Sequence, residues 1–166
     1  MGGSPARKLR HSKRERLFHR GMRILGVDFG SKRIGLALSD ETGTVAQPVG
    51  YVAGGVNEVL RVASERGAGK IVVGLPRRLD GSSSEQTEQT RKFIAALQQA
   101  TALPVESWDE RLTTAQAERV LLEGNVRRAD RKEKRDQLAA TILLQSYLDA
   151  HQEIQNPNTE IRSQSE

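Results

Sequence analysis

The feature that most constrains the fold is a change of hydrophobic pattern about a third of the way along the chain. Residues 22–29, 33–39 and 44–52 each have the pattern of a strand, and short polar turns separate them, which predicts an antiparallel meander. Beyond residue 55, apolar positions at helical spacing alternate with short apolar runs. In order, this part predicts a helix ending at Gly67, a strand at 71–74, a helix between Ser83 and Pro104, a strand at 105–108, a helix between Thr113 and Gly124, and a long helix over about 130–150.

This order predicts an α/β fold: a mixed five-stranded sheet with helices on both faces. It is the element order of the ribonuclease H-like fold. We expect the strands at 22–29, 71–74 and 105–108 to lie in the centre of the sheet. Their chain ends should converge at one edge, where ligands usually bind in sheets of this type.

Two local signals refine this expectation. Pro48 predicts that the third strand is an edge strand or is distorted, because proline has no N–H to donate. Ser82 or Ser83, with Glu85 or Gln86 three residues later, predicts a capping box at the start of the helix before Pro104.

Charge divides the 166 residues into a basic end and a nearly neutral body. Residues 1–21 hold seven of the 26 basic residues and one of the 21 acids, which leaves 19 basic and 20 acidic residues for the rest. We expect residues 1–21 to be a disordered basic extension, 22–151 one ribonuclease H-like domain, and 152–166 a polar tail. No apolar region follows the basic residues and no run of 18 apolar residues exists, so we expect neither a signal peptide nor a membrane partner, and a cytoplasmic location.

Several kinds of catalysis are excluded or disfavoured by composition. The chain has no cysteine, which rules out disulfides, thiolate catalysis and cysteine-ligated zinc. Its three histidines, His11, His19 and His151, all lie near the ends, so a Ser-His-Asp triad is not expected. If the chain is an enzyme, carboxylates are the side chains left to carry its chemistry.

The first candidate acid is Asp28, at the end of an otherwise apolar strand. Burying an ionised carboxylate is costly unless it is paired or bound to a metal. Gly30, two residues later, lets the chain turn and lets a ligand approach the backbone. Taken alone, Asp28 is better explained as a turn-forming or helix-capping residue.

The other candidates follow the last strand and begin the last helix. Asp109 and Glu110 are adjacent, and neighbours on a strand point to opposite faces, so at most one of them should reach a shared site. A solvated loop with a local Glu–Arg pair is the alternative. Asp136 is in line with Ala140 and Leu143 on the apolar stripe of the long helix, where an acid needs a partner.

Together these acids predict a site made only of oxygen ligands, which suits Mg²⁺ or Mn²⁺. Two such ions, roughly 3.5–4 Å apart, would activate water and stabilise the leaving oxygen during cleavage of a phosphodiester bond. A metal-dependent nuclease is therefore the first functional hypothesis.

Four segments, in order over residues 22–150, resemble the motifs of the YqgF family, also called RuvX. They are Gly26-Val27-Asp28-Phe29-Gly30-Ser31-Lys32-Arg33-Ile34-Gly35-Leu36-Ala37, then Val73-Gly74-Leu75-Pro76 with Asp80-Gly81-Ser82, then Asp109-Glu110-Arg111-Leu112-Thr113-Thr114, and finally Lys134-Arg135-Asp136 with Ala139-Ala140 and residues 142–148.

This resemblance implies a ribonuclease H-like hydrolase related to Holliday-junction resolvases, which processes the 5′ end of pre-16S rRNA in ribosome biogenesis. It implies that Asp28, Glu110 and Asp136 are the catalytic acids and the metal ligands, with Asp109 as the alternative to Glu110. Junction resolution in DNA recombination or repair, which would need a symmetric homodimer, stays open as the second hypothesis.

Basic residues near these acids are candidates for binding nucleic-acid phosphates. Aromatic residues make up only 4% of the chain, so recognition of backbone and shape in a structured substrate, precursor rRNA or branched DNA, is expected rather than base stacking. The candidates are Lys32, Arg33, Arg77, Arg78, Arg127, Arg128, Arg131, Lys132, Lys134 and Arg135.

Two other classes remain as alternatives. Strand–turn–strand hairpins with Asp-x-Gly also occur in actin-like ATPases, but those clamp a nucleotide between two domains and are usually at least twice this length. A non-catalytic RNA-binding protein with a relict site is the other alternative, and metal-dependent cleavage that needs Asp28 would eliminate it.

Overall fold

In a computed structural model, the chain is described over residues 22–78, 80–112 and 130–155, except for the side chains of 130–137 and 153–155. The expected extension at 1–21, the expected helix between 113 and 124, and residues 156–166 lie outside the described residues.

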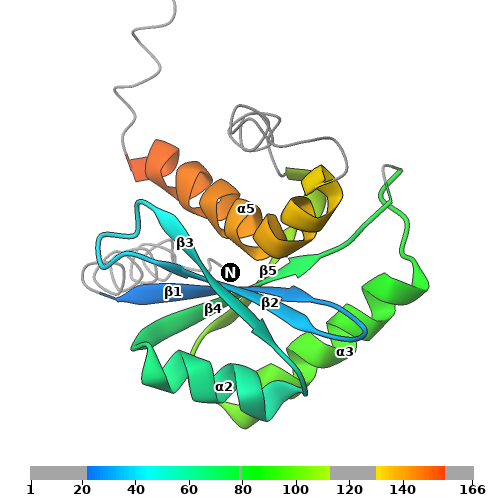
Figure 1. Ribbon diagram of the computed structural model, residues 1–166, viewed down its shortest axis with the longest axis horizontal. Helices are drawn as coiled ribbons and strands as arrows, with labels where there is room; N and C mark the ends of the chain where they lie inside the picture. Colours follow the sequence, from blue (N-terminus) through cyan, green and yellow to red (C-terminus); the bar gives the residue numbers. More distant parts are fainter. Residues whose placement is uncertain (1–21, 79, 113–129, 156–166) are drawn as a thin grey trace, which may run out of the picture.

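The strands form one mixed sheet, in the order β3-β2-β1-β4-β5 (Figure 1). β1 pairs with β2 and β2 with β3 in antiparallel fashion, which confirms the predicted meander. β4 is parallel to β1, and β5 is parallel to β4. The bounds are β1 (Arg23–Phe29), β2 (Ile34–Ser39), β3 (Ala46–Val52), β4 (Ala68–Leu75) and β5 (Val105–Asp109).

The predicted strand order is correct for β1 and β4 and wrong for β5. β1 and β4 lie in the interior of the sheet, whereas β5 is an edge strand of the described sheet. Each parallel crossover returns the chain one position further from β1, so the last strand is the outermost on that side. The predictions from Pro48 are confirmed: β3 is the opposite edge, and its pairing with β2 shifts register between Leu36 and Ala37, the residue paired with Pro48.

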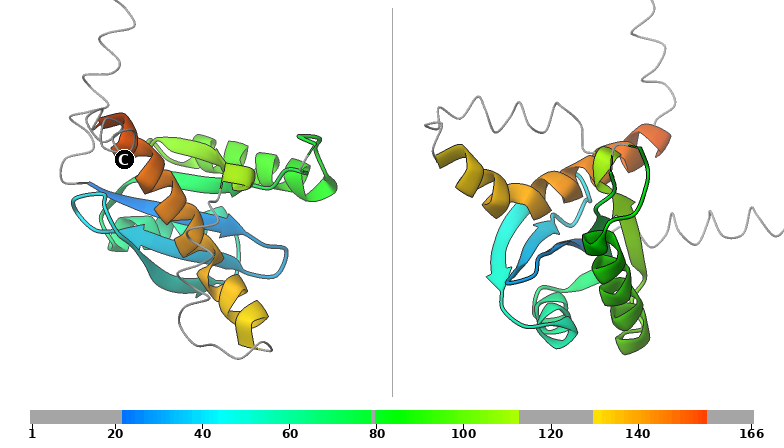
Figure 2. Two further views of the ribbon diagram at one scale, coloured as in Figure 1. Left: turned by 90° about the horizontal axis from the view of Figure 1, so that it is seen from above. Right: turned by 90° about the vertical axis from the view of Figure 1, so that its right-hand side faces the viewer.

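Helices cover both faces of the sheet, as predicted (Figures 1 and 2). α2 (Val56–Glu65) and α3 (Glu85–Ala100) pack on one face, and α5 (Asp130–Gln155) crosses the other. Successive side chains of a strand point to opposite faces of the sheet, so β1 contributes to two hydrophobic cores. Leu25 and Val27 join the core beneath α2 and α3, whereas Ile24 joins the core beneath α5. No helix in the described part of the chain is long and apolar enough to cross a membrane.

The start of α3 differs from the sequence prediction. The N-cap is Ser84, and neither Ser82 nor Ser83 caps the helix. Ser84 Oγ accepts a hydrogen bond from the Thr87 backbone N–H, and Thr87 Oγ1 accepts one from the Ser84 N–H at 3.0 Å. Thr87 Oγ1 also donates to the Pro76 carbonyl at 2.6 Å, which ties the helix start to the loop after β4.

Polar side chains fix α5 across the start of β3. Gln145 Oε1 accepts from the Ala46 N–H at 2.9 Å, and its Nε2 donates to the Thr44 carbonyl at 3.0 Å. Gln152 Nε2 donates to the Gly43 carbonyl at 3.2 Å. α5 ends at Gln155, within the segment expected to be a polar tail, and the hydrogen bond of Gln152 lies beyond the expected end of the domain.

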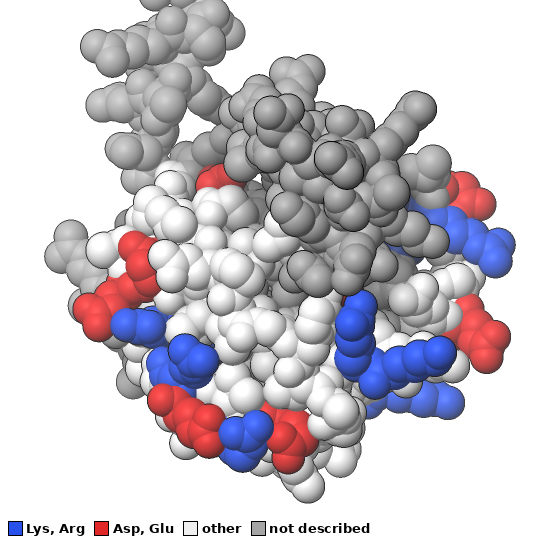
Figure 3. All heavy atoms as spheres, viewed as in Figure 1, with Lys and Arg blue, Asp and Glu red and all other residues white. Residues whose placement is uncertain are grey.

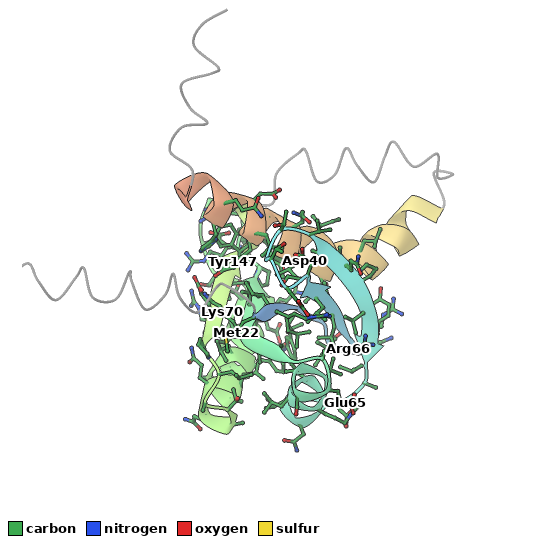
Figure 4. The ribbon with its side chains drawn as sticks, turned by 90° about the vertical axis from the view of Figure 1, so that its left-hand side faces the viewer. Met22, Asp40, Glu65, Arg66, Lys70 and Tyr147 are labelled. Atoms are coloured by element: carbon green, nitrogen blue, oxygen red, sulfur yellow. The ribbon has the colours of Figure 1, made fainter. Side chains whose placement is uncertain are left out.

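A second set of contacts ties α5 to β4 and β5. Tyr147 is fully buried, and its hydroxyl donates to Glu106 Oε2 at 3.0 Å. Lys70 Nζ lies 2.6 Å from the same oxygen, and Figure 4 shows Lys70 and Tyr147 as neighbours. Burial raises the pKa of Glu106, but the hydrogen bonds from Lys70 and Tyr147 and the charges of Lys70 and His151 together outweigh it, so the pKa is lowered overall. This network orients α5 relative to the parallel strands.

Candidate active site

Asp28 lies near the end of β1, on the sheet face that α5 covers. Ile24 packs beneath α5, and strand alternation puts Asp28 on the same face. Asp28 pairs with Gly35 of β2. A Cβ built on Gly35 would lie 3.6 Å from the Cβ atoms of both Asp28 and Ala140, so Asp28 is close to α5 at Ala140.

The turn after β1 is tight, as the Asp-x-Gly pattern predicts. A Cβ at Gly30 would lie only 2.5 Å from the Arg33 carbonyl oxygen, so only glycine allows this close backbone approach. The turn places Lys32 and Arg33 in solvent, a few residues from Asp28.

Glu110 begins the short 3₁₀ helix η1 (Glu110–Leu112), directly after β5. Its Oε1 lies 3.0 Å from the position that a Cβ on Gly74 would occupy. Burial and repulsion by Asp28, and then by Asp109, raise the pKa of Glu110 to about 7. The structure therefore brings the carboxylates of Asp28 and Glu110 close enough to repel one another.

Asp109 has a different partner. Arg111 Nη2 lies 2.6 Å and its Nε 3.0 Å from Asp109 Oδ2, and the Arg111 N–H donates to Asp109 Oδ1 at 2.9 Å. The hydrogen bonds from Arg111 hold the pKa of Asp109 below its usual value. Arg111 thus pairs with Asp109 instead of forming the local Glu–Arg pair given as the alternative, and Glu110 is the acid beside Asp28.

The position of Asp136 is described only through the backbone of α5. Its side chain lies outside the described residues. Ala140 and Leu143, four and seven residues later, both approach the sheet, at Gly35 and Gly74. Helical spacing therefore puts position 136 on the sheet-facing side of α5, one turn before Ala140.

The donor set suits a hard divalent cation. Asp28 and Glu110 approach one another over the part of the sheet where Gly35 and Gly74 have no side chains. A bound cation would relieve the repulsion between their carboxylates. Among the described side chains, no group of three Asp, Glu, His or Cys residues is close enough to hold a metal ion. The pair needs a further ligand, and position 136 is the candidate.

Four of the ten candidate phosphate-binding residues have described side chains, and all four are exposed. Lys32 and Arg33 lie in the β1–β2 turn, where the Arg33 guanidinium is 4.2 Å from the centre of the Tyr51 ring. Arg77 and Arg78 follow β4, and the charge of Arg77 helps lower the pKa of Asp109. Figure 3 shows Lys and Arg side chains on the right-hand side of that view, and others at the lower left among Asp and Glu side chains. The remaining candidates, Arg127, Arg128, Arg131, Lys132, Lys134 and Arg135, have side chains outside the described residues.

One residue that borders the site was not expected from the sequence. The sequence placed Gly74 in an apolar strand and in the second family motif without a role at the site, yet it lies under Glu110. The sequence signal that could have drawn attention to Gly74 is its place at the end of the apolar run 71–74, in which the three preceding residues all have β-branched side chains.

Comparison with known proteins confirms the resemblance to a family. The sequence model described as "RuvX: Holliday junction resolvase" matches residues 22–150. A protein of Pelotomaculum thermopropionicum, provisionally named a pre-16S rRNA nuclease, is 44% identical over 135 residues, covering 78% of this chain and 88% of its own length. A protein of Symbiobacterium thermophilum with the same provisional name is 46% identical over 134 residues, covering 78% and 93%.

Solved structures support the fold. RuvC of Thermus thermophilus, in a complex with a Holliday junction substrate, superimposes with a TM-score of 0.54 at 16% identity. The match covers 79% of this chain and 96% of that chain. At this identity the likeness concerns the fold alone, and it confirms the ribonuclease H-like architecture.

Proposed function

This chain belongs to the RuvX family, and we propose that it hydrolyses phosphodiester bonds of precursor 16S rRNA at the 5′ end of the mature sequence. Nuclease activity follows from the family and from relatives that share more than 40% of the residues. The choice of precursor rRNA rests on the names of those relatives. Such a role belongs in the cytoplasm.

The observation that carries the proposal is the convergence of Asp28 and Glu110 on the α5 face of the sheet. Burial, and then repulsion by Asp28, raises the pKa of Glu110 to about 7, and a bound cation would offset both effects. We assign Asp28, Glu110 and Asp136 as the residues that hold Mg²⁺ or Mn²⁺. When bound, two such ions would activate a water molecule and stabilise the leaving oxygen.

The protein residues supply position and charge. Asp28 is held by β1 in the centre of the sheet, and Glu110 by the turn that ends β5, so both carboxylates come from rigid elements. Lys32, Arg33, Arg77 and Arg78 are exposed beside this edge, where their charges would attract the phosphates that flank the scissile bond. No histidine is needed as a general base in this arrangement.

Resolution of four-way DNA junctions is the second candidate. It is favoured by the description of the matching family and by the fold shared with RuvC. A resolvase cuts two strands symmetrically, so this activity would require two copies of the chain.

Cleavage by the purified full-length protein separates these functions. Precursor 16S rRNA and a four-way DNA junction are incubated side by side with Mn²⁺ or with EDTA, using Asp28→Asn as the control. We expect Mn²⁺-dependent cleavage of the RNA that the variant lacks. Cleavage of the junction and not of the RNA would show that the substrate is branched DNA. Absence of cleavage of either substrate would favour an RNA-binding protein without catalysis.

A further inference from the structure

Gly74 occupies a crowded position on the α5 face of β4. A Cβ there would lie 3.0 Å from Glu110 Oε1, and 3.0 and 3.1 Å from the two terminal methyl groups of Leu143. Such contacts are shorter than ordinary van der Waals separations of about 3.5–4.0 Å. One of these neighbours would have to move if residue 74 carried a side chain.

Two other glycines on the same face make different contacts. A Cβ at Gly35 would lie 3.6 Å from its nearest neighbours, which is ordinary contact. A Cβ at Gly26 would lie 2.8 Å from the Leu144 Cβ and 3.3 Å from the Ala140 carbonyl oxygen, so Gly26 lets α5 approach β1. Of these three, only Gly74 lies against the carboxylate of a candidate ligand.

We infer that Gly74 is a positioning residue, whose missing side chain leaves the space in which the Glu110 carboxylate lies beside Asp28. The inference rests on the proposed function, because it treats Glu110 as a metal ligand. Repulsion from Asp28 alone would move Glu110 away, toward water. The free space over β4, bordered by Leu143, lets the carboxylate lie over the sheet instead.

The direct test is Mn²⁺ binding by the full chain, measured by titration calorimetry. Gly74→Ala should weaken binding by about tenfold or more, the effect typical of residues that orient a ligand. Gly55→Ala is the control: it adds the same methyl group at the start of α2, where the added atom would meet nothing within 4 Å, and it should leave the affinity within about twofold. Equal affinity of Gly74→Ala and the unchanged protein would overturn the inference.

The contact with Leu143 must be separated from the contact with Glu110. The Gly74→Ala change is therefore repeated in a Leu143→Ala background and in a Glu110→Asp background, which withdraws the carboxylate by one methylene group. We expect the loss of Mn²⁺ affinity to persist in the first background. If it disappears there, the effect runs through α5 packing and the inference fails.

If Gly74→Ala folds poorly, the melting temperature measured in EDTA still tests the inference, because it needs no metal binding. The drop in melting temperature caused by Gly74→Ala should be smaller in the Glu110→Asp background than in the unchanged protein. If the drop in melting temperature becomes smaller only in the Leu143→Ala background, the inference is overturned.

The two proposals fail in different ways. If Asp28→Asn and Glu110→Gln lose Mn²⁺ binding but Gly74→Ala keeps it, the proposed function stands and the positioning role does not. If Asp28→Asn binds Mn²⁺ like the unchanged protein, the assignment of the metal site itself is wrong.

Discussion

Asp109 and Glu110 are neighbours in the chain, yet their carboxylates have different partners. Asp109 is held by Arg111 through four hydrogen bonds of 2.6 to 3.1 Å, whereas Glu110 lies over Gly74 and is repelled by Asp28. The division occurs where β5 ends and η1 begins. Two adjacent acids are thereby given opposite electrostatic surroundings.

These surroundings predict opposite roles in metal binding. Glu110→Gln should weaken Mn²⁺ binding by about tenfold or more, and Asp109→Asn should change it by much less, since Arg111 already neutralises Asp109. Calorimetric titration of both variants with Mn²⁺ makes the comparison, and both substitutions remove one charge at nearly constant shape. The reverse ranking would make Asp109 the ligand.

The raised pKa of Glu110 predicts how the stability of the metal-free protein depends on pH. In the folded state Glu110 keeps its proton up to about pH 7, whereas its ordinary pKa is 4.5. The folding stability that comes from protonated Glu110 is therefore fully present below pH 4.5 and is lost as pH rises through about 7. In EDTA, Glu110→Gln should therefore raise the melting temperature at pH 8 and change it little at pH 4.5. A lower melting temperature of the variant at pH 8 would contradict this explanation.

Asp28→Asn should abolish metal-dependent cleavage and leave the fold intact. The substitution keeps the side-chain shape and removes the charge that repels Glu110. Circular dichroism should match the unchanged protein, and the melting temperature in EDTA at pH 8 should be equal or higher. Full cleavage activity in this variant would exclude a mechanism that uses Asp28 as a metal ligand.

Salt dependence identifies which basic residues bind phosphates. Replacing Arg127, Arg128, Arg131 and Arg135 with Gln should reduce the slope of binding against salt by about one unit for each phosphate that is no longer neutralised. Removing residues 1–21 should leave cleavage intact, with a decrease in affinity that high salt masks. If that removal abolishes cleavage and the four-arginine variant behaves normally, the nucleic-acid surface lies in the extension.

Tyr147→Phe should lower stability without changing cleavage. The variant loses the 3.0 Å hydrogen bond to Glu106, which is worth about 1.5 kcal/mol for a charged acceptor. Tyr147 is roughly 16 Å along α5 from position 136, so the proposed site is unaffected. Urea denaturation measures the first effect and a cleavage assay the second, and an equal fall in both would place the Tyr147 network in the active site.

The fold was predictable where local pattern and packing agree. Apolar runs located the strands, and helical spacing located α2, α3 and α5, because each element buries the face that its sequence makes apolar. The place of β5 at the edge was not predictable from such patterns. It depends on where each crossover returns the chain, which involves contacts between whole elements.

The details that decide the site were harder to predict. The capping-box rule favours Glu or Gln at the third helical position, and the sequence prediction accordingly missed Ser84, whose partner is the threonine hydroxyl of Thr87. The choice between Asp109 and Glu110 also stayed open, since strand alternation stops at the turn where their side chains diverge. The role of Gly74 depends on neighbours that come from distant parts of the chain.

The hydrogen bonds between Ala46 and Gln145 and between Gly43 and Gln152 join residues 99 and 109 positions apart. A chain still growing on the ribosome can complete all five strands before these partners exist. Asp28 and Glu110 would then lie on an uncovered sheet, without the helix that carries Asp136. We expect the site to assemble only after α5 has been synthesised.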